Sequence, residues 1–501
     1  MSSNYSSFVG VIFVFNLIIG PGSLTLPTVV QKTGWLLSSI IIAVLAFISY
    51  VTFTFIIESI TITNAIVQLR KLQMMKNVTR QLKACKDMLT HITTVNYDRG
   101  STASTDSFNS EDEVPIFDNP ALASTSNLMD FPPESVELLS LDNRIEMGEM
   151  VNVLLPPFAK VLFFISLSGY LFGDMSIYYK AIGRSLVDFT CNNSNNNTNE
   201  SSLCWENYSF TRHEVYLAYL GLYIISFGPF TFFNVQKTKY LQVISFVMRI
   251  TAMFTMLSLA TIRIITPIED KGNPPAVFFP AVPQLIGASI YAFMCHHSIP
   301  SVIAPVKNKN KILIKIAADF LFIYSLYMGL CITGSYAFNN VNELYTINFT
   351  PTQSTGLLYK AIDSFLILFP VLTISISFPI IAITLRNNLQ VMLLPDDAHW
   401  VWRKIILPLI SLITPVLLAA FVADLEDLVS IVAIYAGTGI QYVIPALLVI
   451  AARAEIPQQV AGIKNDYCSP FRSNYWPLGI LVWSVICVVL LSLFLINKLF
   501  H

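Results

Sequence analysis

The chain has 501 residues, of which 54% are hydrophobic and only 12% are charged, and its formal net charge is −1. A soluble chain usually carries about 25% charged residues, so this composition indicates a membrane protein with many spanning segments. A near-neutral charge gives no reason to expect a nucleic-acid partner. The first apolar run lacks a basic start and a clear cleavage site, so we interpret it as a retained span and not as a signal peptide.

The first predicted span, about Phe8–Val30, is interrupted at its centre by a Gly-Pro-Gly sequence. Proline lacks an N–H and clashes with the preceding turn, and glycine costs about 1 kcal/mol in a helix, so we expect the helix to break halfway across the membrane. Backbone groups freed at that depth need a partner, and such interruptions mark binding sites in transporters. The alternative is a simple kink with small residues packed against a neighbouring helix. The residues expected to bind solute at this break are Ile19, Gly20, Pro21, Gly22 and Ser23.

Windows of roughly 20 apolar residues recur along the chain, and they predict an all-α polytopic membrane protein with about eleven transmembrane helices. Residues 70–86 form a basic run, and residues 87–145 are rich in Ser, Asp, Glu, Asn and Pro. The latter have too little apolar surface to offset the entropy of ordering, so we expect them to be a disordered loop. The expected organisation is helices 1 and 2 in residues 1–68, the second ending near Ile60, a cytosolic and largely disordered loop in 69–150, helices 3–10 in 151–452, and a cytosolic connection with helix 11 in 453–501.

The loop at residues 190–212 carries four N-x-S/T glycosylation sequons, and a fifth follows the seventh predicted span. Four sequons in one short loop indicate a luminal or extracellular face. Cys191 and Cys204 bracket the first three sequons, so we expect a disulfide on that face; the alternative is two free thiols. The expected glycosylation sites are Asn192, Asn196, Asn199, Asn207 and Asn348.

The distribution of basic residues predicts the orientation. They gather in one set of alternating loops, which includes the 70–86 run, whereas the sequon-bearing loops belong to the other set. By the positive-inside rule the N-terminus is cytosolic, and an odd number of helices places the C-terminus on the luminal or extracellular side.

The sixth predicted span, about Pro283–Ile303, repeats the plan of the first. An apolar half is followed by a polar centre, Cys-His-His-Ser at 295–298, and then by Pro300. Five spans separate one interruption from the other, and because five is odd the two segments run in opposite directions, as an inverted repeat requires. The alternative for His296 and its neighbour His297 is satisfied packing or a cytosolic helix end.

Four stretches of the membrane region read "FNLIIGPGSLTLP", "YAFMCHHSIPS", "FPVLTISISFPIIAITLRNN" and "YAGTGIQYVIPALLV". They resemble the amino acid/auxin permease superfamily and, within it, the transmembrane protein 104 family. The resemblance covers nearly the whole membrane region but not residues 87–145. It implies a sodium-symporter-like fold of two inverted five-helix repeats plus one extra helix. It also implies transport of amino acids, coupled to sodium or protons, by alternating access around the broken helices 1 and 6.

A transporter of this kind must match an α-carboxylate with N–H donors and an α-ammonium with carbonyl groups, and the broken first helix offers both. Pro21 removes one donor at that point. We expect the sixth span to supply the opposite wall and the third span to add a tyrosine, for which interior packing is the alternative. These further solute-binding residues are Tyr170, Ser289, Tyr291, Phe293 and Cys295.

The resemblance also suggests where a driving ion would bind. Asn16 precedes the glycine break, Ser377 falls where sodium-coupled relatives place a hydroxyl, and Thr373 lies one turn earlier on the same helix face. Hard cations prefer such oxygen ligands, although these hydroxyls can instead bond to their own helix. Proton coupling would need a titratable group inside the membrane. For titratable residues near the end of a span, the alternative to a role in coupling is that the side chain extends to the water at the membrane surface. The candidates are Asp174 and His296, followed by Asp363 and Glu58.

The segment from Glu134 to Leu138 and Leu139 resembles an acidic dileucine signal, which sorting adaptors read on proteins bound for endosomes and lysosomes. Such short patterns also arise by chance, so the plasma membrane stays open as a location.

Two functions remain: a secondary transporter, and a non-transporting sensor that signals through the 87–145 loop. We see no metal cluster or nucleophile motif and therefore do not expect an enzyme. The expected partners are the lipid bilayer, a small solute and a co-transported Na⁺ or H⁺.

Overall fold

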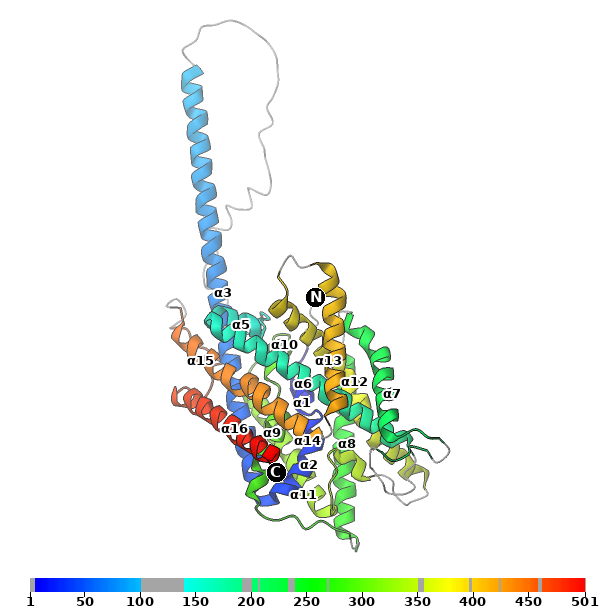
Figure 1. Ribbon diagram of the computed structural model, residues 1–501. Coiled ribbons are helices and arrows are strands. Elements are labelled where there is room, and N and C mark those ends of the chain that lie inside the picture. The colour runs from blue at the N-terminus through cyan, green and yellow to red at the C-terminus, as the bar shows by residue number, and fades with distance from the viewer. Residues whose placement is uncertain are drawn as a thin grey trace.

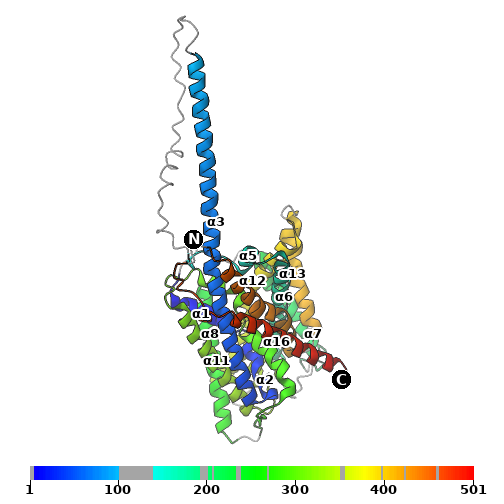
Figure 2. The same ribbon diagram turned by 90° about the vertical axis from the view of Figure 1, so that its left-hand side faces the viewer.

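The computed structural model describes residues 5–100, 139–191, 201–205, 208–232, 239–267, 270–349, 356–395, 399–422, 425–457 and 462–500. Within these ranges the regular structure is helical, apart from two isolated bridges that pair Tyr5 with Val306 and Leu203 with Thr211. The helices pack into one bundle, from which a single long helix projects (Figures 1 and 2). The predicted all-α polytopic fold is confirmed.

The first half of the described chain contains two consecutive short helices, one very long helix, a further short helix and three longer ones. They are α1 (Ser7–Ile18), α2 (Gly22–Thr33), α3 (Trp35–Gly100), the short α5 (Met147–Leu154), α6 (Pro157–Thr190), α7 (Arg212–Phe227) with the 3₁₀ turn η3 (Gly228–Phe232), and α8 (Lys239–Ile265).

The second half begins with another interrupted helix and ends with a single long one. Its elements are η4 (Phe279–Ala281), α9 (Val282–Ala292), η5 (His296–Ser298), α10 (Ile299–Ile303), α11 (Ile312–Ala337), η6 (Tyr345–Phe349), α12 (Leu357–Leu393), η7 (Trp402–Ile406), α13 (Leu407–Phe421), α14 (Leu425–Ile431), the π-helical turns η8 (Val432–Gly437) and η9 (Gly439–Val443), α15 (Ile444–Ala454) and α16 (Tyr475–Phe500).

Nine helices in the described part of the chain are long and apolar enough to cross a membrane, and the bent pair α1–α2 makes a tenth candidate. The pair α9–α10 occupies residues 282–303, where the sequence predicts an eleventh, but its interruption leaves each half short. The structure therefore supports a many-spanning protein, and the total of eleven stays a prediction.

Helix α3 continues far beyond the predicted end of the second span near Ile60. It has 66 residues, so at about 1.5 Å per residue it is roughly 100 Å long, several times the thickness of a hydrocarbon core. Its far part projects alone from the bundle (Figures 1 and 2). The expectation of a disordered loop from residue 87 is therefore wrong as far as Gly100. Residues 61–99 contain no glycine or proline, so polar composition alone does not end the helix.

Residues 101–138, which include Glu134 and Leu138 of the predicted sorting signal, lie outside the described part of the chain, and Leu139 opens the next described segment. The chain returns to the bundle there. The side-chain amide of Asn64 in α3 donates to the carbonyl of Ser140 at 2.9 Å, and Lys309 forms an ion pair with Asp142 at 2.6 Å. The chain thus leaves the bundle after Asn64 and returns to it at Ser140 on the same side.

Glu58 is a structural anchor between α3 and the connection that precedes α16. Its side chain is 3% exposed, and the guanidinium of Arg453 donates to both carboxylate oxygens at 2.9 Å. The backbone N–H of Ser469 donates to the same carboxylate at 3.1 Å, and Arg453 donates to the carbonyl of Phe471 at 3.1 Å. These partners account for the burial of Glu58 without a role in proton coupling.

The predicted disulfide is present. Cys191 follows α6 directly and is bonded to Cys204, with the two Cα atoms 4.6 Å apart. An ion pair between Asp188 and Arg212 joins α6 to α7 beside it. Among the predicted glycosylation sites only Asn348 is described, and its side chain donates to the carbonyl of Asn340 at 2.9 Å. Asn192, Asn196, Asn199 and Asn207 lie outside the described residues, so glycosylation stays a prediction.

We expect removal of this disulfide to destabilise the protein. A bond that closes a loop of this size contributes about 3 kcal/mol, because it restricts the unfolded chain. The double variant Cys191→Ser, Cys204→Ser should therefore unfold at a lower temperature than the wild type. Reductant should lower the midpoint of the wild type but not that of the double variant. Cys85→Ser is the control, since Cys85 is an exposed free cysteine. Equal midpoints for the double variant and the wild type would contradict the prediction.

Candidate functional site

The predicted interruption of the first membrane helix is present. Helix α1 ends at Ile18 and α2 begins at Gly22, with an angle of 52° between them. Ile19 has an extended backbone, with φ −82° and ψ 93°, and Pro21 caps the start of α2. The Gly-Pro-Gly sequence therefore breaks the helix instead of only kinking it.

The second interruption follows the same plan. Helix α9 ends at Ala292, and a short 3₁₀ turn at His296–Ser298 precedes α10. Tight turns replace the helical ladder between them: the N–H of Met294 donates to the carbonyl of Tyr291 at 3.2 Å, and that of Ser298 to Cys295 at 3.1 Å. The two interruptions lie in the first and sixth segments, as an inverted repeat requires.

The two broken helices touch at Gly22. A Cβ atom on Gly22 would lie 2.7 Å from the ring of Tyr291 and 2.9 Å from the Cα atom of Ala292. By contrast, no atom lies within 4 Å of the corresponding position on Gly20. Only glycine fits at position 22, because the start of α2 lies directly against the end of α9.

The carbonyl groups at the end of α1 are occupied by a buried arginine. Arg249 of α8 is 3% exposed, and one guanidinium nitrogen donates to the main-chain oxygens of both Asn16 and Ile19. Among the described residues no carboxylate forms an ion pair with it. The negative end of the α1 dipole therefore faces a guanidinium that belongs to the protein itself.

Two hydroxyl groups satisfy further carbonyls of both breaks. The hydroxyl of Tyr327 in α11 lies 3.1 Å from the main-chain oxygens of both Ile18 and Ala292, so its one hydrogen is shared between the ends of α1 and α9. The hydroxyl of Ser23 donates to the oxygen of Gly20 at 2.7 Å. Because bare carbonyls are costly inside a membrane, these contacts stabilise both interruptions.

A small central cavity of about 80 Å³ lies beside the first break. A water molecule takes up about 30 Å³ and ligand pockets usually exceed about 300 Å³, so the cavity must widen before it can hold an organic solute. Residues of α1–α2, α6, α8, α9, the second break and α12 contribute to its wall, among them Asn16, Gly20, Pro21, Gly22, Tyr170, Asp174, Tyr178, Gln242, Tyr291, Met294, His297, Ser298, Ser377 and Thr384.

Asp174 of α6 is the carboxylate of this cavity. It is 4% exposed, and the hydroxyl of Tyr291 in α9 donates to it. The ring of Tyr170, one turn earlier on α6, lies 6.4 Å from the ring of Tyr291 and 5.5 Å from that of His297. The structure thus brings together Tyr170, Asp174 and Tyr291, which the sequence indicated separately, at the point where α6 meets the second break.

Other predicted site residues lie in the surrounding packing. His296 points towards α3, where its Nε2 lies 2.8 Å from the hydroxyl of Thr52, and its neighbour His297 lines the cavity instead. Phe293 packs its ring 5.3 Å from that of Tyr327. No sequence signal distinguishes the two histidines, because the 3₁₀ turn decides which one faces inward. The predicted residues outside the cavity wall are Ile19, Ser23, Ser289, Phe293, Cys295, His296 and Thr373.

The predicted cation ligands differ in their contacts, and the side-chain oxygen Oδ1 of Asn16 is buried without a hydrogen-bond partner in the described part of the chain. The amide of Asn16 donates to the main-chain oxygen of Gln242 at 2.7 Å, and the hydroxyl of Thr373 bonds to Phe369 of its own helix at 2.9 Å. Ser377 lines the cavity. These contacts do not form a common set of ligands, so a sodium site at these residues stays a prediction. The sequence did not indicate Arg249 and Gln242 as site residues, because only the fold brings α8 next to the first break.

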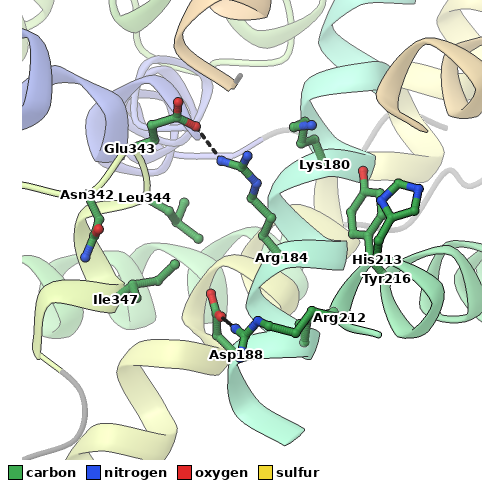
Figure 3. Close-up of a pocket in the computed structure, with 11 residues that line it drawn as sticks. Lys180, Arg184, Asp188, Arg212, His213, Tyr216, Asn342, Glu343, Leu344 and Ile347 are labelled. Carbon is green, nitrogen blue, oxygen red and sulfur yellow. Dashed lines mark hydrogen bonds and ion pairs between the residues drawn. The ribbon is translucent and has the colours of Figure 1, made fainter. Parts of the chain in front are cut away.

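A second, larger cavity of about 250 Å³ lies further along α6, towards the end of the helix that Cys191 follows. Figure 3 shows the side chains that line it. Two ion pairs cross it, Arg184 with Glu343 and Asp188 with Arg212. Glu343 also accepts from the N–H of Leu425 at 3.0 Å, so it links α6 to the start of α14. Six residues, or about 9 Å of helix, separate Asp174 of the central cavity from Lys180 of this outer cavity.

An all-helical membrane protein whose two interrupted helices meet at a small polar cavity has the architecture of a solute transporter. The chain belongs to the family of transmembrane amino acid transporter proteins, whose model matches residues 3–73 and 136–493. Within it the chain belongs to the transmembrane protein 104 family. A transmembrane protein 104 homolog of Drosophila melanogaster is 36% identical, covering 98% of this chain and 97% of its own. Human transmembrane protein 104 is 36% identical over 97% of this chain and 96% of its own. A Dictyostelium discoideum homolog is 31% identical over 97% of this chain.

Proposed function

We propose that the protein is a secondary active transporter of amino acids or similar small organic solutes, coupled to sodium or protons, that works by alternating access. The observation that carries the proposal is the contact of both broken helices beside one small cavity, which is lined in part by polar side chains. Neither family membership nor the names of the relatives specify the substrate or the driving ion.

The chemistry of the cavity suits a zwitterion. The start of α2 is the positive end of a helix dipole and would face an α-carboxylate, and the buried carboxylate of Asp174 would face an α-ammonium. Because Tyr291 belongs to α9 and Asp174 to α6, movement of the second broken helix against α6 must break their hydrogen bond. Binding of a solute ammonium or a proton at Asp174 would accompany that movement.

The direct test is uptake of pooled labelled amino acids into liposomes that contain the purified protein, with and without a sodium or a pH gradient. We expect Asp174→Asn to lower uptake by at least about tenfold, or about 1.4 kcal/mol, because the isosteric amide removes the charge and the proton site. Tyr291→Phe should lower uptake less, since it removes only the hydrogen-bond donor.

Tyr324→Phe is the matched control for these variants. Tyr324 lies in α11, and its hydroxyl donates to the carbonyl of Ser39, away from the cavity. It should transport like the wild type. Full uptake by Asp174→Asn would exclude that carboxylate from solute binding and coupling, and absence of uptake for every pooled solute under every gradient would count against transport itself.

One observation favours the second candidate function, a sensor that binds solute without moving it. Helix α3 projects from the bundle and ends far from it, as a docking element for a partner would (Figure 1). Residues 71–138 can be replaced by a short linker, because Asn64 already bonds to the carbonyl of Ser140. A transporter should keep its uptake after this deletion, whereas a sensor should bind solute and lose its signal.

The location of the protein also belongs to the proposal. We infer a plasma-membrane or endosomal and lysosomal protein, with the segment 134–139 as the adaptor signal and the 190–212 loop glycosylated on the luminal or extracellular side. The test compares the wild type with a Leu138→Ala, Leu139→Ala variant in fractionated cells. The sorting signal is supported if the wild type is found in lysosomal fractions and the variant is not.

A further inference from the structure

We propose that Arg249 replaces a bound cation at the end of α1, so that this protein does not use sodium there. The statement that Arg249 takes the place of a cation does not depend on the proposed function. The conclusion about the driving ion rests on the proposed function. Arg249 was not among the residues that the sequence indicated.

The geometry at the first break is that of an ion site. The main-chain oxygens of Asn16 and Ile19 lie one turn apart at the C-terminal end of α1 and converge on one guanidinium nitrogen of Arg249. Carbonyl oxygens at the negative end of a helix dipole are suitable ligands for a hard cation. Here the protein supplies the positive charge from α8, and the two oxygens are no longer available to a free ion.

The charge of Arg249 also disfavours a second cation nearby. Its side chain is buried, and among the described residues no carboxylate neutralises it. Screening by water and salt is weak at a buried site, so a sodium ion beside the guanidinium would meet a strong like-charge repulsion. The side-chain NH2 group of Asn16 donates to Gln242, and the hydroxyl of Tyr327 lies 3.1 Å from the oxygen of Ile18, so the Oδ1 atom of Asn16 is the oxygen beside the guanidinium that has no hydrogen-bond partner among the residues that the structure describes.

The groups that remain for coupling are carboxyl groups inside the bundle. Asp174 faces the central cavity. Asp319 of α11 is 6% exposed, and its Oδ2 atom has no hydrogen-bond partner. Buried ionisable side chains in membrane segments are functional sites by default, and carboxyl groups carry protons. If the protein is a transporter, we therefore expect a pH gradient, acting through these carboxyl groups, to drive it in place of sodium bound at the end of α1.

The site can be tested on the purified full-length protein without knowledge of the substrate. Thermal unfolding midpoints are measured in NaCl, KCl and choline chloride at equal ionic strength. A sodium ion that binds only the folded state would raise the midpoint in NaCl alone. We expect the wild type to show equal midpoints in the three salts. A rise specific to NaCl would overturn the proposal.

Arg249→Ala leaves the two oxygens without their donor. We expect a lower midpoint, and a partial recovery in millimolar ethylguanidinium or in NaCl, because either cation can then reach the vacated position. If neither cation restores the midpoint, or if the variant is as stable as the wild type, Arg249 is a packing residue and the proposal fails. Should the alanine variant not fold, Arg249→Lys retains the charge and should fold with a midpoint that is insensitive to sodium.

Arg263→Ala is the matched control. Arg263 lies on the same helix, and its Nε donates to the carbonyl of Ala337 at 2.8 Å, but its side chain is 31% exposed. Ethylguanidinium and sodium should not change the midpoint of this variant. In liposomes, replacement of sodium by choline should leave wild-type uptake unchanged. Absence of uptake under all gradients would count against the proposed function, while the midpoints would still decide the role of Arg249.

Discussion

Replacement of Gly22 by valine should abolish uptake and lower the stability of the protein by about 1–3 kcal/mol, the usual cost of forcing extra atoms into a packed site. A Cβ atom at this position would lie 2.9 Å from a backbone atom of Ala292, which cannot rotate away as a side-chain end could. The start of α2 and the end of α9 would have to separate, and the cavity beside them would change shape. Uptake and the unfolding midpoint of the purified variant measure the two effects.

Gly20→Ala is the control for this variant, since the space around position 20 is open. It changes the same tripeptide at the same break, but we expect a midpoint close to that of the wild type. Equal behaviour of the two variants would show that the break tolerates a side chain at either glycine. The close contact between the two broken helices would then not be required.

Loss of the Glu58–Arg453 ion pair should be the most destabilising change in the buried part of α3. Removal of one partner from a buried pair typically costs about 3–5 kcal/mol, because the other charge stays buried without compensation. Both Glu58→Gln and Arg453→Met should therefore lower the unfolding midpoint strongly, and they should free the connection at residues 468–472 from α3. The midpoint and the rate of limited proteolysis at this connection are the measurements.

The exposed pair Lys464–Asp466 in the same connection provides the comparison, with side chains 90% and 71% exposed. Lys464→Ala should leave the midpoint unchanged, since ion pairs on the surface contribute little. If Glu58→Gln were equally harmless, the anchoring role would be wrong, and Glu58 would return as a candidate for proton coupling.

Local chemistry was enough to predict the two interruptions. Proline and glycine act on their own turn of the helix, so the break at residues 20–22 and the one near Pro300 could be located without a fold. The same reasoning identified the Cys191–Cys204 pair, because both cysteines flank one short loop. It failed at the end of α3, where composition suggested disorder but no residue between 61 and 99 breaks a helix.

The composition, the spacing of apolar segments and the helix-breaking residues by themselves determined that this is an all-α membrane protein with two broken helices. The tertiary structure decided which side chains meet at those breaks. It selected His297 over His296, paired Asp174 with Tyr291 across two helices, and placed Arg249 on carbonyls more than two hundred residues away in the chain. Helical breaks depend on neighbours in sequence, whereas the groups that fill them come from whichever helices pack alongside.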